Sequence, residues 1–177
     1  RVLFRSGIKV LQLHLNTNKQ QVDSVTVDML EPKLDVPAQY TGSAPDLSEF
    51  HLPLIKDASV HPTFVSMGNP HFVIFLDKEQ IKDTNMLISN AELTEFGHSL
   101  EHNTAFPERC NIEFACLTAN NHLRTRVWER GSGITMACGT GSCATATAAI
   151  LNGLADRSKP VEIEMDGGTL SVEWRKD

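Results

Sequence analysis

The sequence predicts a mixed α/β (α+β) fold in which a mainly antiparallel β-barrel surrounds one central helix. Two observations carry this prediction. Apolar and polar residues alternate over several short segments joined by turn residues, which is the pattern of β-hairpins. Segment 142–151 consists mostly of Ala, Thr, Ser and Cys, so it predicts a helix without a polar stripe, and such a helix must be buried. Strand pairs before and after that helix are expected to wrap it in a closed or nearly closed barrel.

The elements follow from local patterns, and together they indicate a single domain over 1–177 with its core at about 6–175. The expected strands are 8–15, 22–30, 58–66, 71–76, 110–117, 122–130, 161–165 and 169–174. The expected helices are a weak one at 81–88, a better one at 92–102 with apolar residues three and four apart, and the buried one at 142–151. Segment 33–54 has no period and several Pro and Gly residues, so we expect a long covering loop with a short strand at 50–54. Because most strands are linked as hairpins, the order is not a βαβ pattern.

The composition excludes several classes of partner. The chain has 177 residues, 41% of them hydrophobic, and a net charge of -6, which argues against nucleic acid or an anionic membrane as its main partner. The longest apolar run, 72–76, is far too short to span a bilayer. The first residue is Arg rather than Met, so the natural start is expected upstream of it.

The four cysteines are too few and too irregularly spaced for a disulfide scaffold. They are Cys110, Cys116, Cys138 and Cys143, and none forms a C-x-x-C pair. We therefore expect reduced thiols in a cytoplasmic protein, or in a plastid if the source is a plant. A zinc site with His61 or His71 lacks the usual ligand spacing.

The stretch 129–144 combines a charged pair, a glycine-rich turn and a thiol at the start of the buried helix. Gly139 and Gly141 allow the backbone to turn tightly and to bring N–H groups close to a ligand. A helix N-terminus binds carboxylate or phosphate, and the same field is expected to lower the pKa of Cys138 below about 8.5. An anion site and an activated thiol therefore coincide.

Each candidate feature also has a simpler interpretation. Asn69, before Pro70, is expected to project from an extended kink, or only to satisfy a local Asx turn. His71 is either functional or a core histidine, and the pair Glu129–Arg130 is either functional or a surface ion pair. The pattern Gly-x-Gly-x-x-Ala at 139–144 matches a dinucleotide fingerprint, with Asp156 or Glu164 as the ribose-binding acid. That interpretation is disfavoured because the surrounding strands are expected to pair as hairpins rather than through crossovers.

Three blocks together resemble the diaminopimelate epimerase family in order and spacing. They are Met-Gly-Asn-Pro-His-Phe-Val at 67–73, Phe-Pro-Glu-Arg-Cys-Asn-Ile-Glu-Phe at 106–114, and Trp-Glu-Arg-Gly-Ser-Gly through Ala-Cys-Gly-Thr-Gly at 128–141. The resemblance implies two similar domains, each a β-barrel around a helix, with the active site between them. It also implies cofactor-independent and metal-free interconversion of LL- and meso-2,6-diaminopimelate, a step of lysine and cell-wall biosynthesis, by two cysteines on opposite faces of one carbon.

The resemblance assigns roles to eight residues of this chain. The implied catalytic residues are Cys138, Glu129 and His71, and the implied contacts to the diamino diacid substrate are Asn69, Asn111, Glu129, Arg130, Gly139 and Thr140. Arg130 is expected to clamp a carboxylate, while Cys143 matches no catalytic position and is assigned to the core.

One departure from the family decides how the chain is interpreted. The family's first domain holds the second cysteine in a motif like Cys-Gly-Asn-Gly, and no such motif occurs here. We therefore expect this chain to be the second domain, with the N-terminal domain as a missing partner, and to be inactive alone. The alternatives are a racemase of another amino acid and a non-catalytic single-domain carboxylate-binding protein. A second copy of the chain, in a homodimer, is another partner compatible with the sequence.

Overall fold

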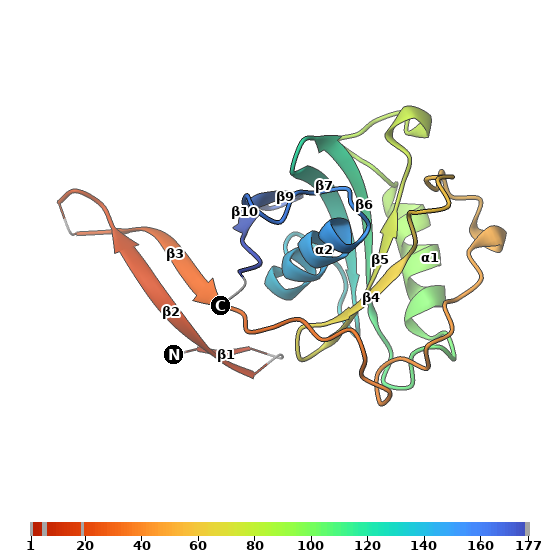
Figure 1. Cartoon of the computed structure of the whole chain (residues 1–177), viewed down its shortest axis with the longest axis horizontal. Helices are drawn as coiled ribbons and strands as arrows, with labels where there is room; N and C mark the ends of the chain where they lie inside the picture. Colours follow the sequence, from red (N-terminus) through yellow and green to blue (C-terminus); the bar gives the residue numbers. More distant parts are fainter. Residues whose placement is uncertain (1, 5–6, 19, 176–177) are drawn as a thin grey trace.

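A seven-stranded sheet separates two helices that pack on its opposite faces (Figure 1). This computed structural model describes residues 2–4, 7–18 and 20–175. The strand order is β10-β9-β7-β6-β5-β4, with β8 paired to β7. The bounds are β4 (Thr63–Ser66), β5 (Pro70–Phe75), β6 (Asn111–Ala119), β7 (His122–Glu129), β8 (Gly133–Thr135), β9 (Val161–Met165) and β10 (Gly168–Val172). The predicted α+β class is confirmed.

A second, three-stranded sheet is formed by β1 (Val2–Phe4), β2 (Gly7–Leu15) and β3 (Val22–Asp28). The predicted hairpin is present, since Leu13 lies opposite Val25 and Leu11 opposite Val27. Figure 1 shows that β2 and β3 extend away from the sheet and its helices. Side chains on both strands remain exposed, including Leu13 at 55% and Val25 at 44%.

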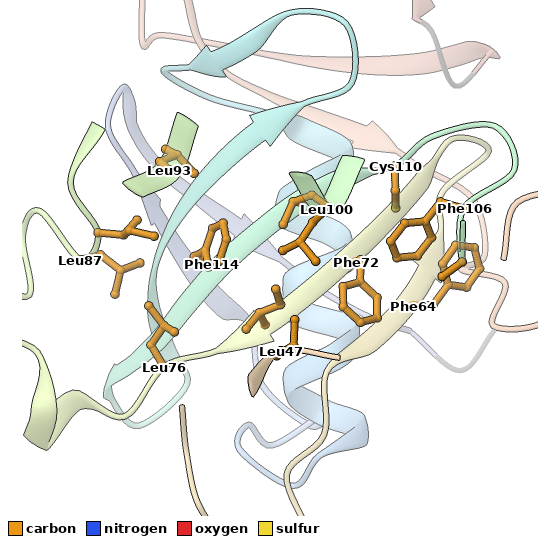
Figure 2. Packing of buried hydrophobic residues seen from close by; sticks show 14 of the residues in the cluster. Leu47, Phe64, Phe72, Leu76, Leu87, Leu93, Leu100, Phe106, Cys110 and Phe114 are labelled. Atoms are coloured by element: carbon orange, nitrogen blue, oxygen red, sulfur yellow. The ribbon is translucent and has the colours of Figure 1, made fainter. Parts of the chain in front are cut away.

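Helix α1 (Asn90–Glu101) confirms the helix predicted at 92–102. Ser89 caps it, because its hydroxyl accepts from the Glu92 N–H while the Glu92 carboxylate accepts from the Ser89 N–H, which is a capping box. The helix buries Leu93 and Leu100 against the sheet. Figure 2 shows this apolar layer, in which both leucines belong to the same cluster as Phe72 of β5 and Phe114 of β6.

Helix α2 (Gly139–Leu151) covers the other face, and it begins three residues before the predicted start. Its alanines, together with Thr145 and Thr147, are buried among residues from β4, β5, β6, β7, β9 and β10. Asn152 is the C-cap, and Gly153 follows with φ +70°, the left-handed conformation that commonly ends a helix. The prediction of a buried, small-residue central helix is confirmed.

Two topological expectations are wrong. The sheet is open, because among the described residues no ladder joins the edge strands β10 and β4, so it curves over α2 without closing into a barrel. Strands β5 and β6 are parallel and connected through α1, and β7 and β9 are parallel on either side of α2. Two crossovers therefore exist where hairpins were expected. These crossovers do not revive the dinucleotide-binding interpretation. Asp156, the candidate ribose-binding acid, follows the C-terminus of α2, about 20 Å along the helix from the glycine turn, and is too far away to serve that turn.

Two smaller predictions are also corrected. No helix covers 81–88; the chain instead forms a 3₁₀ turn, η2 (Lys78–Gln80), and bends that end in buried Leu87 and Ile88. No strand covers 50–54, where the turn η1 (Ser48–Phe50) precedes a single bridge from Leu54 to Leu76. The loop at 33–54 does cover another part of the protein, because its apolar side chains pack on the α1 face of the sheet.

Candidate active site

The predicted site residues lie on the α2 face of the sheet, at the end of the strands nearest the start of α2. Side chains alternate between the two faces of a strand. Phe72 and Phe114 pack in the layer on the α1 side, whereas Val73 and Val127 pack in the layer on the α2 side. The same alternation places His71, Asn111, Glu113 and Glu129 on the α2 side.

The Cys138 thiol is the N-cap group of α2. Its sulfur accepts a hydrogen bond from the Gly141 N–H at 3.3 Å and lies 3.5 Å from the Thr140 hydroxyl. Ser142 is the first residue whose N–H bonds within the helix, to the Cys138 carbonyl at 2.8 Å. The N–H groups of Gly139 and Thr140 have no intrahelical acceptor by their position. A carboxylate could therefore bind beside the thiol.

The expectation of a lowered thiol pKa is wrong. Burial, together with the negative charges of Glu113 and Glu129, raises the pKa of Cys138 to about 12. The hydrogen bonds from Thr140 and Gly141 act in the opposite direction but are outweighed. Cys138 is only 8% exposed, so its thiolate would have little contact with water. This lack of hydration destabilises the thiolate by more than the helix N-terminus stabilises it. Cys138 is therefore a protonated thiol in this structure.

His71 is paired with a carboxylate that the sequence analysis did not single out. Its Nδ1 lies 2.6 Å from Oε1 of Glu113, and both side chains are fully buried. Burial raises the pKa of Glu113. The signal for this residue was present in the sequence, because Glu113 is the one charged residue in the strand predicted at 110–117 and lies between Ile112 and Phe114. A carboxylate at such a position must be buried and must find a partner.

Asn69 reaches the helix N-terminus from the turn between β4 and β5. Its Nδ2 donates to the Thr140 hydroxyl at 3.3 Å, which itself lies beside the Cys138 sulfur. The Asn69 Oδ1 is buried and has no partner within the described part of the chain. Gly68, with φ +94°, supplies the left-handed turn that brings Asn69 to this position.

The Asn111 side chain bonds backbone groups of Pro70 and Arg130. The Asn111 amide donates to the Pro70 carbonyl at 2.7 Å and accepts from the Arg130 N–H at 2.9 Å. The Arg130 guanidinium donates to the Glu108 carbonyl at 2.8 Å. The Glu129 carboxylate accepts from the Thr135 hydroxyl at 2.6 Å. All eight predicted residues thus lie at one end of the sheet, and Asn111 fastens β5 to the turn after β7.

Gly141 provides a test of how tightly this site is packed. A Cβ at Gly141 would lie 2.8 Å from Oε1 of Glu113 and 3.2 Å from the Cys138 sulfur, whereas a Cβ at Gly139 would meet nothing within 4 Å. We expect Gly141→Ala to lower the free energy of unfolding by about 1–3 kcal/mol, because the Glu113 carboxylate is held by His71 and cannot move freely. Urea denaturation measures the change. Gly139→Ala is the matched control and should be neutral or stabilising by up to about 1 kcal/mol; equal losses in the two variants would contradict the packing argument.

The described residues form neither a metal-binding cluster nor a membrane-spanning helix. Within 2–4, 7–18 and 20–175, no group of three or more His, Cys, Asp or Glu side chains is arranged to hold a metal ion. In the same ranges, neither helix has the length and hydrophobicity needed to cross a bilayer. All four cysteines are free thiols.

The family model and the curated relatives that match the chain name the same family. The family model for diaminopimelate epimerase matches residues 63–177. The chain is 46% identical over 171 residues to the diaminopimelate epimerase of Phocaeicola vulgatus, covering 97% of this chain and 56% of the relative. It is 40% identical to that of Leptospira biflexa, covering 97% of this chain and 57% of the relative. A PhzF-family phenazine biosynthesis protein of Bacillus anthracis superposes with a TM-score of 0.42 and 20% identity, over 64% of this chain and 31% of that protein. The chain thus spans about half the length of the curated relatives it matches.

Proposed function

The chain belongs to the diaminopimelate epimerase family, and we propose that it supplies one half of a cofactor-independent epimerase acting on LL- and meso-2,6-diaminopimelate. The observation that carries this proposal is the Cys138 thiol at the N-cap of α2, beside N–H groups suited to a carboxylate. One ligand bound there would present its α-carbon to a proton-carrying sulfur. We further propose a cytoplasmic location, which rests on the four free thiols.

In the proposed reaction Cys138 acts first as the acid. Its raised pKa keeps the proton on sulfur at neutral pH, so it can donate that proton to one face of the α-carbon. Inversion requires a base on the opposite face that removes the original proton. Gly139 and Thr140 would bind the α-carboxylate, Glu129 and His71 would hold the amine and handle protons, and Asn69, Asn111 and Arg130 would contact the polar ends of the substrate. The base on the opposite face must come from outside this chain.

The apolar face of the β2–β3 hairpin supports a complementary half as the partner. The hairpin register places Leu11, Leu13, Leu15, Val22, Val25 and Val27 on one face. Exposed fractions of 55% for Leu13, 51% for Leu15 and 49% for Val22 leave this face uncovered. Exposed apolar patches of this kind mark interaction surfaces. The curated relatives are nearly twice as long as the segment matched, and the remainder of their length is the occupant we propose.

The test compares the 177-residue chain with a two-part protein in which the chain is joined to the remainder of the Phocaeicola vulgatus relative. We expect no α-proton exchange in deuterated water and no LL-to-meso conversion by the chain alone, because one acid without a base cannot invert the carbon. The two-part protein should turn over diaminopimelate, and Cys138→Ser should lower kcat by about 10³-fold or more.

Two control variants and three alternative outcomes keep the interpretations separate. Cys143→Ser should leave turnover unchanged, since that thiol lies on α2 away from the N-cap. Leu13→Asp should weaken association when the two parts are supplied as separate chains. Turnover of a different amino acid, such as proline, with none of diaminopimelate would favour a racemase of another substrate. Binding of diaminopimelate without turnover by the two-part protein would favour a carboxylate-binding protein, and epimerisation by the 177-residue chain alone would overturn the two-part proposal.

A further inference from the structure

The buried pair His71–Glu113 carries an inference that rests on the proposed function and deepens it. The pair is joined by one contact of 2.6 Å, from Nδ1 of His71 to Oε1 of Glu113. The second polar atom of each side chain, Nε2 of His71 and Oε2 of Glu113, is buried and has no partner among the described residues. An orphaned buried polar atom costs about 1–3 kcal/mol. A pair that served only packing would be expected to satisfy these atoms.

Glu113 lies directly against the first turn of α2. A single methyl group placed on Gly141 would contact Oε1 of Glu113 at 2.8 Å and the Cys138 sulfur at 3.2 Å. The carboxylate, the thiol and the helix turn therefore surround one small volume, which only a glycine at 141 leaves open. Strand register brings His71 to the same place, because His71 lies opposite Asn111 and Val73 lies opposite Glu113 in the parallel ladder of β5 and β6.

We propose that Glu113 is the positioning residue for His71, holding Nδ1–H so that Nε2 is the ring nitrogen that exchanges a proton within the site. Neutral imidazole has one donor and one acceptor nitrogen, and the hydrogen bond made by one nitrogen selects the role of the other. With Nδ1–H donated to the carboxylate, Nε2 is left as a base. Glu113 acts through His71 and is assigned no direct contact with the substrate.

The first arm of the test uses the 177-residue chain and long-range ¹H–¹⁵N NMR of ¹⁵N-histidine-labelled protein. His71→Asn assigns the ring signals among the seven histidines. We expect His71 Nδ1 to carry the ring proton and Nε2 to be the unprotonated nitrogen, which is the Nδ1–H tautomer. In Glu113→Gln, the ring should lose this fixed tautomer and gain the Nε2–H form. Two results would overturn the proposal: an Nε2–H tautomer in the unmodified chain, or an Nδ1–H tautomer that persists unchanged in Glu113→Gln.

The second arm uses the two-part protein described above. Glu113→Gln should lower kcat by about ten- to hundredfold with KM within about twofold, and Glu113→Asp should recover part of the loss. The pH–kcat profile of Glu113→Gln should be displaced, which a packing defect would not do. Glu164→Gln, on β9, is the matched control and should behave as the unmodified protein.

The two arms separate failure of the inference from failure of the proposed function. If the unmodified two-part protein does not epimerise, the proposed function fails and the tautomer measurement alone decides the role of Glu113. If the unmodified two-part protein epimerises diaminopimelate and Glu113→Gln has the same kcat and pH profile, the inference is overturned while the proposed function stands.

Discussion

Alkylation of Cys138 by iodoacetamide is expected to show a pH dependence displaced by several pH units from that of a free cysteine. The reactive form is the thiolate. With a pKa of about 12, Cys138 holds roughly a thousandfold less thiolate at pH 8 than a free cysteine of pKa about 8.5. The first cause is burial, followed by the charges of Glu113 and Glu129, and the hydrogen bonds from Thr140 and Gly141 lower the pKa only in part.

The shape of the pH–rate curve distinguishes a raised thiol pKa from restricted access of the reagent to the thiol. Restricted access slows alkylation by one factor at every pH, whereas a raised pKa moves the curve. The alkylation rate of Cys138 should therefore rise about tenfold per pH unit from pH 8 to 11, whereas the rate of a free thiol with a pKa of about 8.5 levels off above about pH 9.5. Site-resolved mass spectrometry measures both curves in one sample, with glutathione as the free-thiol reference.

A second thiol in the same helix provides an internal comparison. Burial raises the pKa of Cys143 to about 11, so its curve should lie between those of Cys138 and the free thiol. Glu113→Gln should move the Cys138 curve toward lower pH, because it removes one of the charges that oppose ionisation. A Cys138 rate that levels off near pH 9 would show an activated thiolate and would contradict the assignment of Cys138 as the acid.

Local patterns were sufficient to predict the elements that matter most for the site. The run of small residues at 142–151 predicted a buried helix, and the glycines before it predicted that a thiol would lie at its start; the structure confirms both. The segment at 110–117 was predicted as a strand, and β6 confirms it; alternation along this strand puts Asn111 and Glu113 on one face. These features depend on residues close together in the chain, so the sequence expresses them directly.

Features that depend on distant contacts were not predictable in the same way. The parallel pairing of β5 with β6 joins strands separated by a helix and a long connection, and no local pattern distinguishes that partner from a neighbouring hairpin strand. The pKa of Cys138 depends on how many groups from other elements exclude water from the sulfur. The pairing of Glu113 with His71 depends on the parallel register of β5 and β6, which no local pattern in the sequence shows.

Asp166→Ala is expected to lower the free energy of unfolding by about 3–5 kcal/mol, a large part of the roughly 5–15 kcal/mol that stabilises a typical domain. Asp166 pairs with two arginines of β7: its Oδ1 accepts from Arg124, and its Oδ2 lies 3.0 Å from Arg126. Both arginine side chains are only 7% exposed. Removing the carboxylate would leave two buried cations without a counter-charge, and this is the costly way to break a buried ion pair.

The same arginines connect three parts of the fold, so the loss should extend beyond the ion pairs. Arg124 also donates to the Asn85 carbonyl at 2.9 Å, and Arg126 donates to the Ile88 carbonyl at 2.6 Å, just before α1. On the other side, the turn that holds Asp166 receives the chain leading into α2, since the Gly167 N–H donates to the Met136 carbonyl at 2.7 Å. Loosening this turn should therefore also loosen the position of Cys138.

Chemical denaturation of three variants checks this prediction. Asp166→Asn keeps the size of the side chain and removes its charge, so it should lose most of the same free energy as Asp166→Ala. Glu173→Ala removes the exposed partner of Arg175, a pair 4.0 Å apart with both side chains more than 60% exposed, and should cost less than about 1 kcal/mol. If Asp166→Ala and Glu173→Ala cost the same, the arginines of β7 are solvated rather than paired, and the turn after β9 does not hold the chain that leads to the thiol.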